Sequence, residues 1–108
     1  MAPNEGGHPR LRLEETFRNG VRLSIVAALD GVPRAEFGPL RDLLEVSDSV
    51  LSKQVAALEQ AGYVTVHKGR VERRVRTWLA LTPAGAEALR RHLRAVRDVA
   101  TCSLSPDL

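Results

Sequence analysis

Hydrophobic residues recur along the chain with two different spacings, and the change between them divides it into helices and strands. From residue 19 to residue 61, and again after residue 82, apolar positions recur every three or four residues, as in an amphipathic helix. From residue 63 to residue 81 they alternate with polar positions, as in a strand. The pattern predicts helices at 19–29, 38–46, 48–61 and 83–100, a helical turn at 13–18, a short strand at 34–37, and strands at 63–67 and 75–81 joined by a polar loop at 68–74.

Residues suited to helix ends stand at the ends of these patterns. Asn19, Ser47 and Thr82 each precede a helical pattern, where a side-chain oxygen can accept hydrogen bonds from the free backbone N–H groups of the first turn. Asp48 lies in the first turn of the third helix, where a negative charge suits the helix dipole. Gly62 follows the last turn of that helix and can take the left-handed conformation that commonly ends one.

The third helix has an unusual polar face. Leu51, Val55 and Leu58 form its apolar stripe. A merely solvated opposite face would more often carry long glutamates and lysines, but this one is small and rich in hydroxyl groups. Its residues are Ser49, Ser52, Lys53, Ala56 and Gln60. Such a helix fits into the DNA major groove, which is about 12 Å wide and admits one helix with modest side chains.

Positive charge is concentrated in the segment that follows. The whole chain has a net charge of +3 and a pI near 9.7. Residues 67–76 alone contain five basic residues and one acidic residue, a net charge of +4, and such local patches attract polyanions. A second basic group at 90–97 is interpreted as a solvated helix face.

Taken in order, these elements predict a fold class. Helix, short strand, helix, tight turn, helix and hairpin is the order of a winged helix-turn-helix, mainly α with a small β hairpin, here with a C-terminal dimerisation helix. Contacts with double-stranded DNA are expected from the third helix and from the hairpin, whose arginines can follow the backbone or enter the minor groove. The candidate DNA-binding residues are Ser49, Ser52, Lys53, Gln54, Lys68, Arg70, Arg73, Arg74 and Arg76.

The fourth helix carries a stripe that predicts self-association. Its apolar residues recur at spacings of three and four, as in a helix that packs against another helix. Part of the stripe can instead cover Val21 and Ile25 of the first helix. We expect a homodimer whose interface contains Leu89, Leu93, Val96 and Ala100.

The sequences SDSVLSKQVAALEQAGYVTVHKG and RVRTWLALTPAG also carry a family resemblance. Together they resemble the winged-helix transcriptional regulators of the MarR-like kind, over about residues 19–100. The resemblance implies a homodimeric DNA-binding regulator, most often a repressor, and leaves room for a small-molecule effector. It places Ser49, Ser52 and Lys53 in the recognition helix, and Lys68 and Arg76 in the β wing. Val50 departs from the polar residue common in relatives, so their base preference does not carry over.

Other site chemistries find little support in the sequence. His8, His67 and His92 lie far apart and the single cysteine is Cys102, so no pair has metal-ligand spacing. The serines of the third helix have no nearby histidine base, no phosphate-binding glycine loop is present, and no cofactor is expected. We therefore expect no enzyme activity, no metal and no catalytic residues. Trp78 has two interpretations, cross-strand packing against Tyr63 or Thr65, or a wall of an effector pocket.

The remaining expectations concern organisation and location. Residues 1–12 are interpreted as a disordered leader, 13–102 as the winged-helix domain with its dimerisation helix at 83–100, and 103–108 as a tail. Apolar runs are too short for a membrane span and no signal peptide is visible, so a cytoplasmic location is expected. The alternative function is a winged helix used for protein–protein contact without specific DNA binding. Such a module would have an apolar recognition face and a less basic hairpin.

Overall fold

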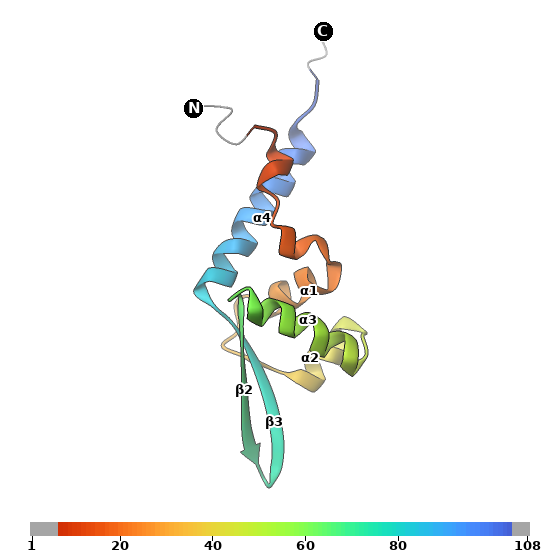
Figure 1. The fold of residues 1–108 in the computed structure, drawn as a ribbon, viewed down its shortest axis with the longest axis vertical. Coiled ribbons are helices and arrows are strands. Elements are labelled where there is room, and N and C mark those ends of the chain that lie inside the picture. Colours follow the sequence, from red (N-terminus) through yellow and green to blue (C-terminus); the bar gives the residue numbers. More distant parts are fainter. Residues whose placement is uncertain (1–6, 105–108) are drawn as a thin grey trace.

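In the computed structural model, which describes residues 7–104, three helices pack beside the root of a small antiparallel sheet (Figure 1). A long hairpin projects from this core at one end of the molecule, and the last helix leads away toward the other end. The elements are η1 (Pro9–Arg12) and η2 (Glu15–Arg18), which are 3₁₀ helices, then α1 (Gly20–Leu29), β1 (Ala35–Glu36), α2 (Phe37–Leu44), α3 (Asp48–Gln60), β2 (Val64–Val71), β3 (Arg74–Leu81) and α4 (Pro83–Thr101).

The sheet has the strand order β1-β3-β2, and all of its pairings are antiparallel. β2 and β3 pair along their whole length, from Val64 opposite Leu81 to Val71 opposite Arg74. β1 adds only two pairs, Ala35 with Leu79 and Glu36 with Trp78. We call the β2–β3 hairpin, residues 64–81, the wing.

The core lies where α1, α3 and α4 meet the root of the wing. The apolar stripes predicted for α1 and α3 are buried there, including Ile25, Leu29, Leu51 and Leu58, and Leu79 joins them from β3. Burial of side chains of this size stabilises a fold by about 1.5–3 kcal/mol each. This core fixes the position of α3 relative to the wing.

The predicted helix ends are confirmed. The Asn19 side chain accepts hydrogen bonds from the N–H groups of Val21 and Arg22, and the Thr82 hydroxyl accepts one from Gly85. Gly62 follows α3 with a φ of +81°, in the left-handed region that glycine enters at little cost. The predicted short strand appears as β1.

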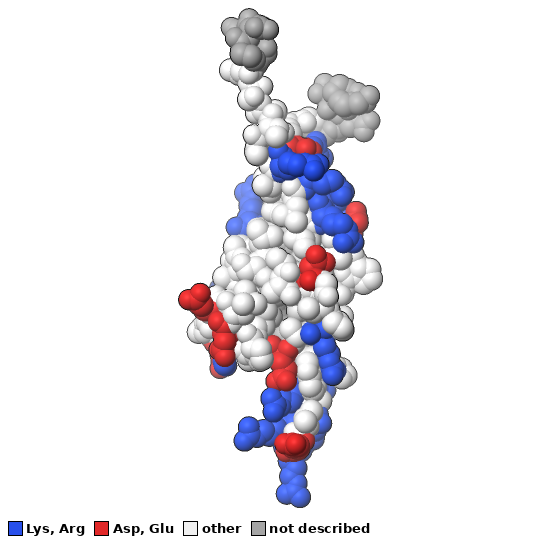
Figure 2. Space-filling view, turned by 180° about the vertical axis from the view of Figure 1, so that it is seen from behind, with Lys and Arg blue, Asp and Glu red and all other residues white. Residues whose placement is uncertain are grey.

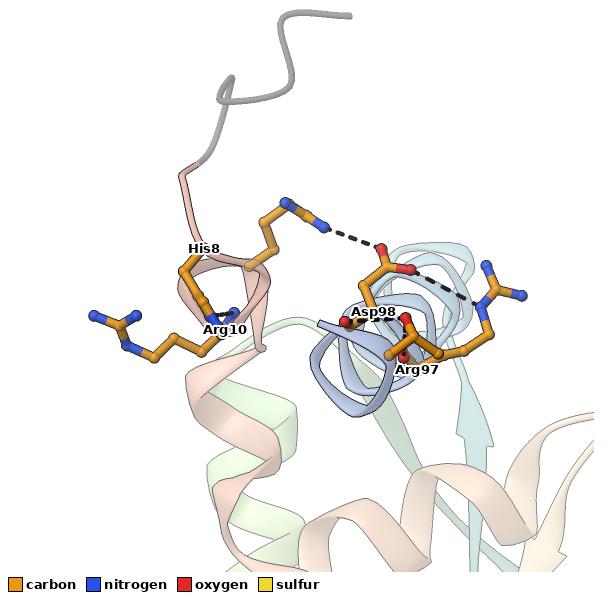
Figure 3. Close-up of polar contacts among 6 residues, drawn as sticks. His8, Arg10, Arg97 and Asp98 are labelled. Atoms are coloured by element: carbon orange, nitrogen blue, oxygen red, sulfur yellow. Dashed lines mark hydrogen bonds and ion pairs between the residues drawn. The ribbon is translucent and has the colours of Figure 1, made fainter. Parts of the chain in front are cut away.

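The N-terminal segment differs from its interpretation as a disordered leader. Within that range, residues 9–12 form η1, which lies along the C-terminal half of α4 (Figure 3). The Arg12 guanidinium donates a hydrogen bond to the Asp98 carboxylate at 3.0 Å, and the His8 side chain accepts one from the backbone N–H of Arg10. A partner 86 residues away cannot be inferred from local pattern, which is why the interpretation of residues 7–12 was wrong. Residues 1–6 and 105–108 lie outside the described residues.

A second difference concerns the predicted loop at residues 68–74. Both strands continue through most of this segment, and only Glu72 and Arg73 form the turn. Both residues have positive φ, 50° and 67°, as the central residues of a type I′ turn require. Asparagine and glycine usually fill these two positions. Because this chain has glutamate and arginine there, nothing in the sequence indicated the turn.

Candidate nucleic-acid interface

The predicted recognition face of α3 is open to solvent. Ser49, Ser52 and Lys53 are all exposed, in the first two turns of the helix. Ser47 begins the helix with its hydroxyl accepting a hydrogen bond from the backbone N–H of Val50 at 3.2 Å. The remaining free N–H groups of this first turn, with the positive end of the helix dipole, suit a phosphate. Val50 is itself 39% exposed, so its methyl groups belong to the same surface.

Gln54 does not belong to this face, although the sequence placed it among the DNA-binding candidates. It is only 9% exposed, and its Oε1 accepts a hydrogen bond from Nε of Arg22 on α1 at 2.8 Å. Arg22 also donates from Nη1 to the carbonyl of Thr16 at 3.3 Å. Gln54 comes three residues after Leu51 and just before Val55, so it shares the inward face of the helix. This spacing is visible in the sequence and could have predicted that Gln54 packs between α3 and α1.

Arg41 on α2 is a residue that the sequence pattern did not indicate. Its Nη1 donates to the Asp48 carboxylate at 2.8 Å, and its Nε donates to Asp42 at 3.0 Å. Asp48 lies in the first turn of α3, where its charge alone would repel a nucleic-acid phosphate. The guanidinium offsets this charge and ties the two helices together. The two residues are seven positions apart across a turn, so only the folded geometry pairs them.

The basic residues of the wing lie on both of its faces. Residues that pair across antiparallel strands share a face. Lys68 and Arg70, opposite Thr77 and Val75, therefore lie on the face that includes Leu79, toward the core and α3. Arg74 and Arg76 lie on the other face with Trp78, and Arg73 occupies the turn.

These side chains are not equally free. All residues from Arg70 to Val75 are exposed. Arg76, in contrast, donates from Nη1 to the Glu36 carboxylate on β1 at 2.9 Å, and its side chain is 39% exposed. Arg76 is therefore partly committed to holding β1 against β3, whereas Arg73 and Arg74 extend into solvent at the tip.

A groove of 420 Å³ separates α3 from the core-facing side of the wing. Ser52 and Ala56 line it from the helix together with the acidic Asp48 and Glu59, and Lys68 and Thr77 line it from the wing. Figure 2 shows lysine and arginine side chains gathered at the end of the molecule where the wing projects. The small polar face of α3 and the basic wing therefore border a single concave surface.

Among residues 7–104, no group of three or more His, Cys, Asp or Glu side chains is placed to hold a metal ion. No helix in the same range is long and apolar enough to cross a membrane. Ser49 Oγ has the Ser47 hydroxyl at 3.3 Å as its hydrogen-bond partner, rather than a histidine base.

Comparison with known proteins places this surface in context. The winged helix DNA-binding domain family matches residues 21–100 of the chain. An uncharacterized protein of Methanocaldococcus jannaschii is 31% identical over 77 residues, which are 71% of this chain and 84% of that protein. Among solved structures, a transcriptional regulator homologue from Pyrococcus horikoshii superimposes with a TM-score of 0.73 at 28% identity, over 79% of this chain and 84% of that one.

A second solved structure is a MarR family transcriptional regulator from Streptomyces coelicolor in complex with DNA. It superimposes with a TM-score of 0.62 at 30% identity, over 82% of this chain and 58% of that one. These two similar structures are transcriptional regulators rather than enzymes. The predicted fold class and family resemblance are confirmed, and the chain belongs to the winged helix DNA-binding domain family, with a fold similar to that of MarR family transcriptional regulators.

Proposed function

We propose that the chain is a sequence-specific, homodimeric regulator of transcription that represses by binding a pseudo-palindromic DNA site. The observation that carries this proposal is the concave surface between α3 and the wing. Its helix side carries Ser52 and Ala56 of the small polar face, and its wing side carries Lys68, which belongs to a hairpin segment of net charge +4 at residues 67–76. A helix of this kind enters the major groove, while flanking arginines contact phosphates or the minor groove.

The proposed contacts divide by chemistry. Lys53 reads base edges, because a lysine ammonium donates to guanine O6 or N7. Ser49 and Ser52 contact phosphates or base edges, and the exposed methyl groups of Val50 pack against a thymine methyl. Lys68, Arg70, Arg73 and Arg74 contact the backbone or minor groove, and Arg76 contributes less because it pairs with Glu36.

The dimer forms through the C-terminal half of α4. Leu93 and Val96 are 51% and 44% exposed there, and Ala100 is also exposed. Leu89, the fourth residue expected in this interface, is only 4% exposed and packs in the core of its own protomer. Leu89 is thus the part of the apolar stripe of α4 that covers α1 within the same protomer. The proposed interface is therefore Leu93, Val96 and Ala100.

The proposal names three partners. They are double-stranded DNA, a second copy of the chain, and a small-molecule effector of unassigned chemistry. A repressor acts beside the DNA it controls, so the cytoplasmic location expected from the sequence belongs to the same proposal. The alternative, a protein-binding winged helix, is less favoured because the α3 face is polar and the wing is basic.

Selection from a random-sequence duplex library at two salt concentrations tests the proposal. We expect enrichment of one motif with two inverted half-sites, and an affinity that falls as salt rises because phosphate contacts release counterions. Enrichment of no motif, with salt-dependent binding retained, would leave only a non-specific DNA binder. Absence of binding at low salt would favour the protein–protein alternative.

A further inference from the structure

The wing depends on a small root for its direction. β1 holds β3 through two residue pairs only, and every residue from Arg70 to Val75 at the far end is exposed. Arg73 lies five residues beyond Trp78, about 17 Å at 3.3–3.4 Å per residue. A tilt of about 15° at the root would then move the tip by about 4 Å, more than the length of a hydrogen bond. A wing that contacts DNA together with α3 needs its root held firmly.

Trp78 lies at this root, on the face opposite Leu79, and is half-buried. Its ring covers Gly69 on the neighbouring strand. A Cβ atom at Gly69 would come within 3.0 Å of Cζ3 of Trp78, closer than ordinary contact allows. Glycine weakens a strand interior, so a glycine here has its explanation in the space that the indole ring occupies.

Arg34 completes the arrangement from the turn before β1. Its guanidinium lies 4.6 Å from the centre of the Trp78 ring, within the range of a cation–π interaction. The Glu36–Arg76 ion pair at 2.9 Å joins β1 to β3, two residues nearer the tip than Trp78. Trp78 thus contacts β2 through Gly69 and the segment leading into β1 through Arg34.

We propose that Trp78 is a positioning residue for DNA binding, which together with Gly69 and Arg34 holds the wing at the angle that lets the tip arginines reach DNA while α3 occupies the major groove. This inference rests on the proposed function and extends it, because it assigns Trp78 an indirect role that acts through the direction of the wing. It gives Trp78 a packing role with Gly69 and Arg34 as neighbours, in place of Tyr63 or Thr65. Trp78 also lines a small surface pocket of 160 Å³ with Arg34, Thr65 and His67.

A double-mutant cycle on the full-length chain tests the inference. The variants are W78A, R73A/R74A and the triple variant W78A/R73A/R74A, measured against the selected duplex. If Trp78 acts through the tip, W78A and R73A/R74A each weaken binding by about tenfold and the triple variant binds within about twofold of R73A/R74A. Multiplication of the two effects in the triple variant would overturn the positioning role. An R73A/R74A variant that binds as the wild type would instead remove the wing from the proposed function.

Two further variants guard against misfolding of W78A. W78F keeps a ring over Gly69 and beside Arg34, and should restore affinity to within about threefold of the wild type. G69A keeps the tryptophan but forces its ring to shift by a few tenths of an ångström, and should weaken binding in the same direction as W78A and by less. Hydrogen exchange without DNA gives an independent readout: W78A and G69A should accelerate exchange of wing amides at residues 70–75 and leave α1 and α3 unchanged. Unchanged exchange in the wing together with wild-type binding by G69A would contradict the proposal.

Discussion

Two adjacent side chains on α3 have different roles because they face different surroundings. Lys53 is exposed beside Ser52, whereas Gln54 is buried and accepts a hydrogen bond from Arg22. A sequence pattern that groups both as long polar residues therefore assigns them to the same surface. The folded geometry separates a candidate base contact from a contact between helices.

Alanine substitutions at these two positions should separate the roles. Lys53→Ala should relax base preference at one or two positions of the selected site, at about 1–3 kcal/mol of discrimination, with little change in thermal unfolding. Gln54→Ala should leave the selected sequence unchanged and lower stability by about 1–3 kcal/mol, because the Arg22 donor is left without its buried partner. Site selection and calorimetry on both variants provide the comparison. Identical selected sites for Lys53→Ala and wild type would refute the base contact.

His92 on α4 is a buried titratable group that holds the N-terminal segment. Its Nδ1 accepts a hydrogen bond from the backbone N–H of Glu14 at 3.1 Å, and its ring packs edge-on against Phe17. An accepting Nδ1 requires the neutral ring with its proton on Nε2. Burial lowers the pKa of His92, and the nearby Glu14 carboxylate opposes this shift only in part.

This lowered pKa predicts a dependence of stability on pH. The unfolded chain takes up a proton near pH 6.5 while the folded chain resists it, so the contribution of His92 is present above that pH and declines as pH falls toward the folded pKa. His92→Gln offers an accepting amide oxygen that does not titrate. Its free energy of unfolding should fall less than that of the wild type between about pH 7 and pH 5. Denaturant titrations at pH 7 and pH 5 measure the free energy of unfolding of both proteins. An equal decrease in the wild type and the variant would show that the His92 ring does not cause the pH dependence.

At the scale of elements, local signals predicted most of the fold. Asn19, Ser47, Gly62 and Thr82 each act within a few residues, so the ends of the helices could be predicted from sequence. The face of α3 was also predictable, apart from Gln54. Pairing between distant segments was not predictable: Arg12 of η1 pairs with Asp98 of α4, and the groove forms only where α3 and the wing lie side by side. The wing turn was missed because Glu72 and Arg73 occupy backbone conformations that such residues seldom adopt.

The wing tip should supply salt-dependent affinity. Arg73→Ala/Arg74→Ala should weaken binding to all duplexes alike and flatten the slope of log K against log salt by about one unit for each phosphate that an arginine no longer neutralises. Arg10→Ala/Arg18→Ala removes the same charge from η1 and η2, far from the wing, and serves as the control. An unchanged slope in the wing variant would remove the tip arginines from the phosphate contacts, and an equal change in the control would assign the effect to net charge alone.

The turn itself offers a test of strain. A residue other than glycine at positive φ costs about 1–3 kcal/mol where the conformation is rarely populated. Glu72→Asn keeps a side chain that tolerates this region and removes the acidic group among the tip arginines. We expect both a higher melting temperature and tighter DNA binding. Tighter binding without added stability would leave electrostatics as the sole effect, and weaker binding would mean that Glu72 itself contacts the duplex.

At the scale of the whole molecule, the two ends have different tasks in the proposed function. The wing and α3 form the DNA-binding end, and α4 with η1 forms the other (Figure 1). The stripe on α4 passes from the core to the surface along its length, because Leu89 is buried while Leu93 and Val96 are about half-exposed. One helix thus joins the core of the protomer to the proposed dimer interface, so pairing of two α4 helices would fix the separation of two α3 helices.

Leu93→Glu tests this arrangement. A dimer of this variant would bury one carboxylate from each copy in the apolar contact between the two α4 helices. The variant should therefore be monomeric by light scattering at concentrations where the wild type is dimeric. Affinity for a palindromic site should fall far more than non-specific affinity, because only a dimer holds two recognition helices about 34 Å apart, one DNA turn. Val32→Glu places the same charge at a comparably exposed apolar residue in the turn after α1, and should leave the dimer intact. A wild-type chain that is monomeric at tens of micromolar and still binds the palindrome tightly would contradict a dimer built through α4.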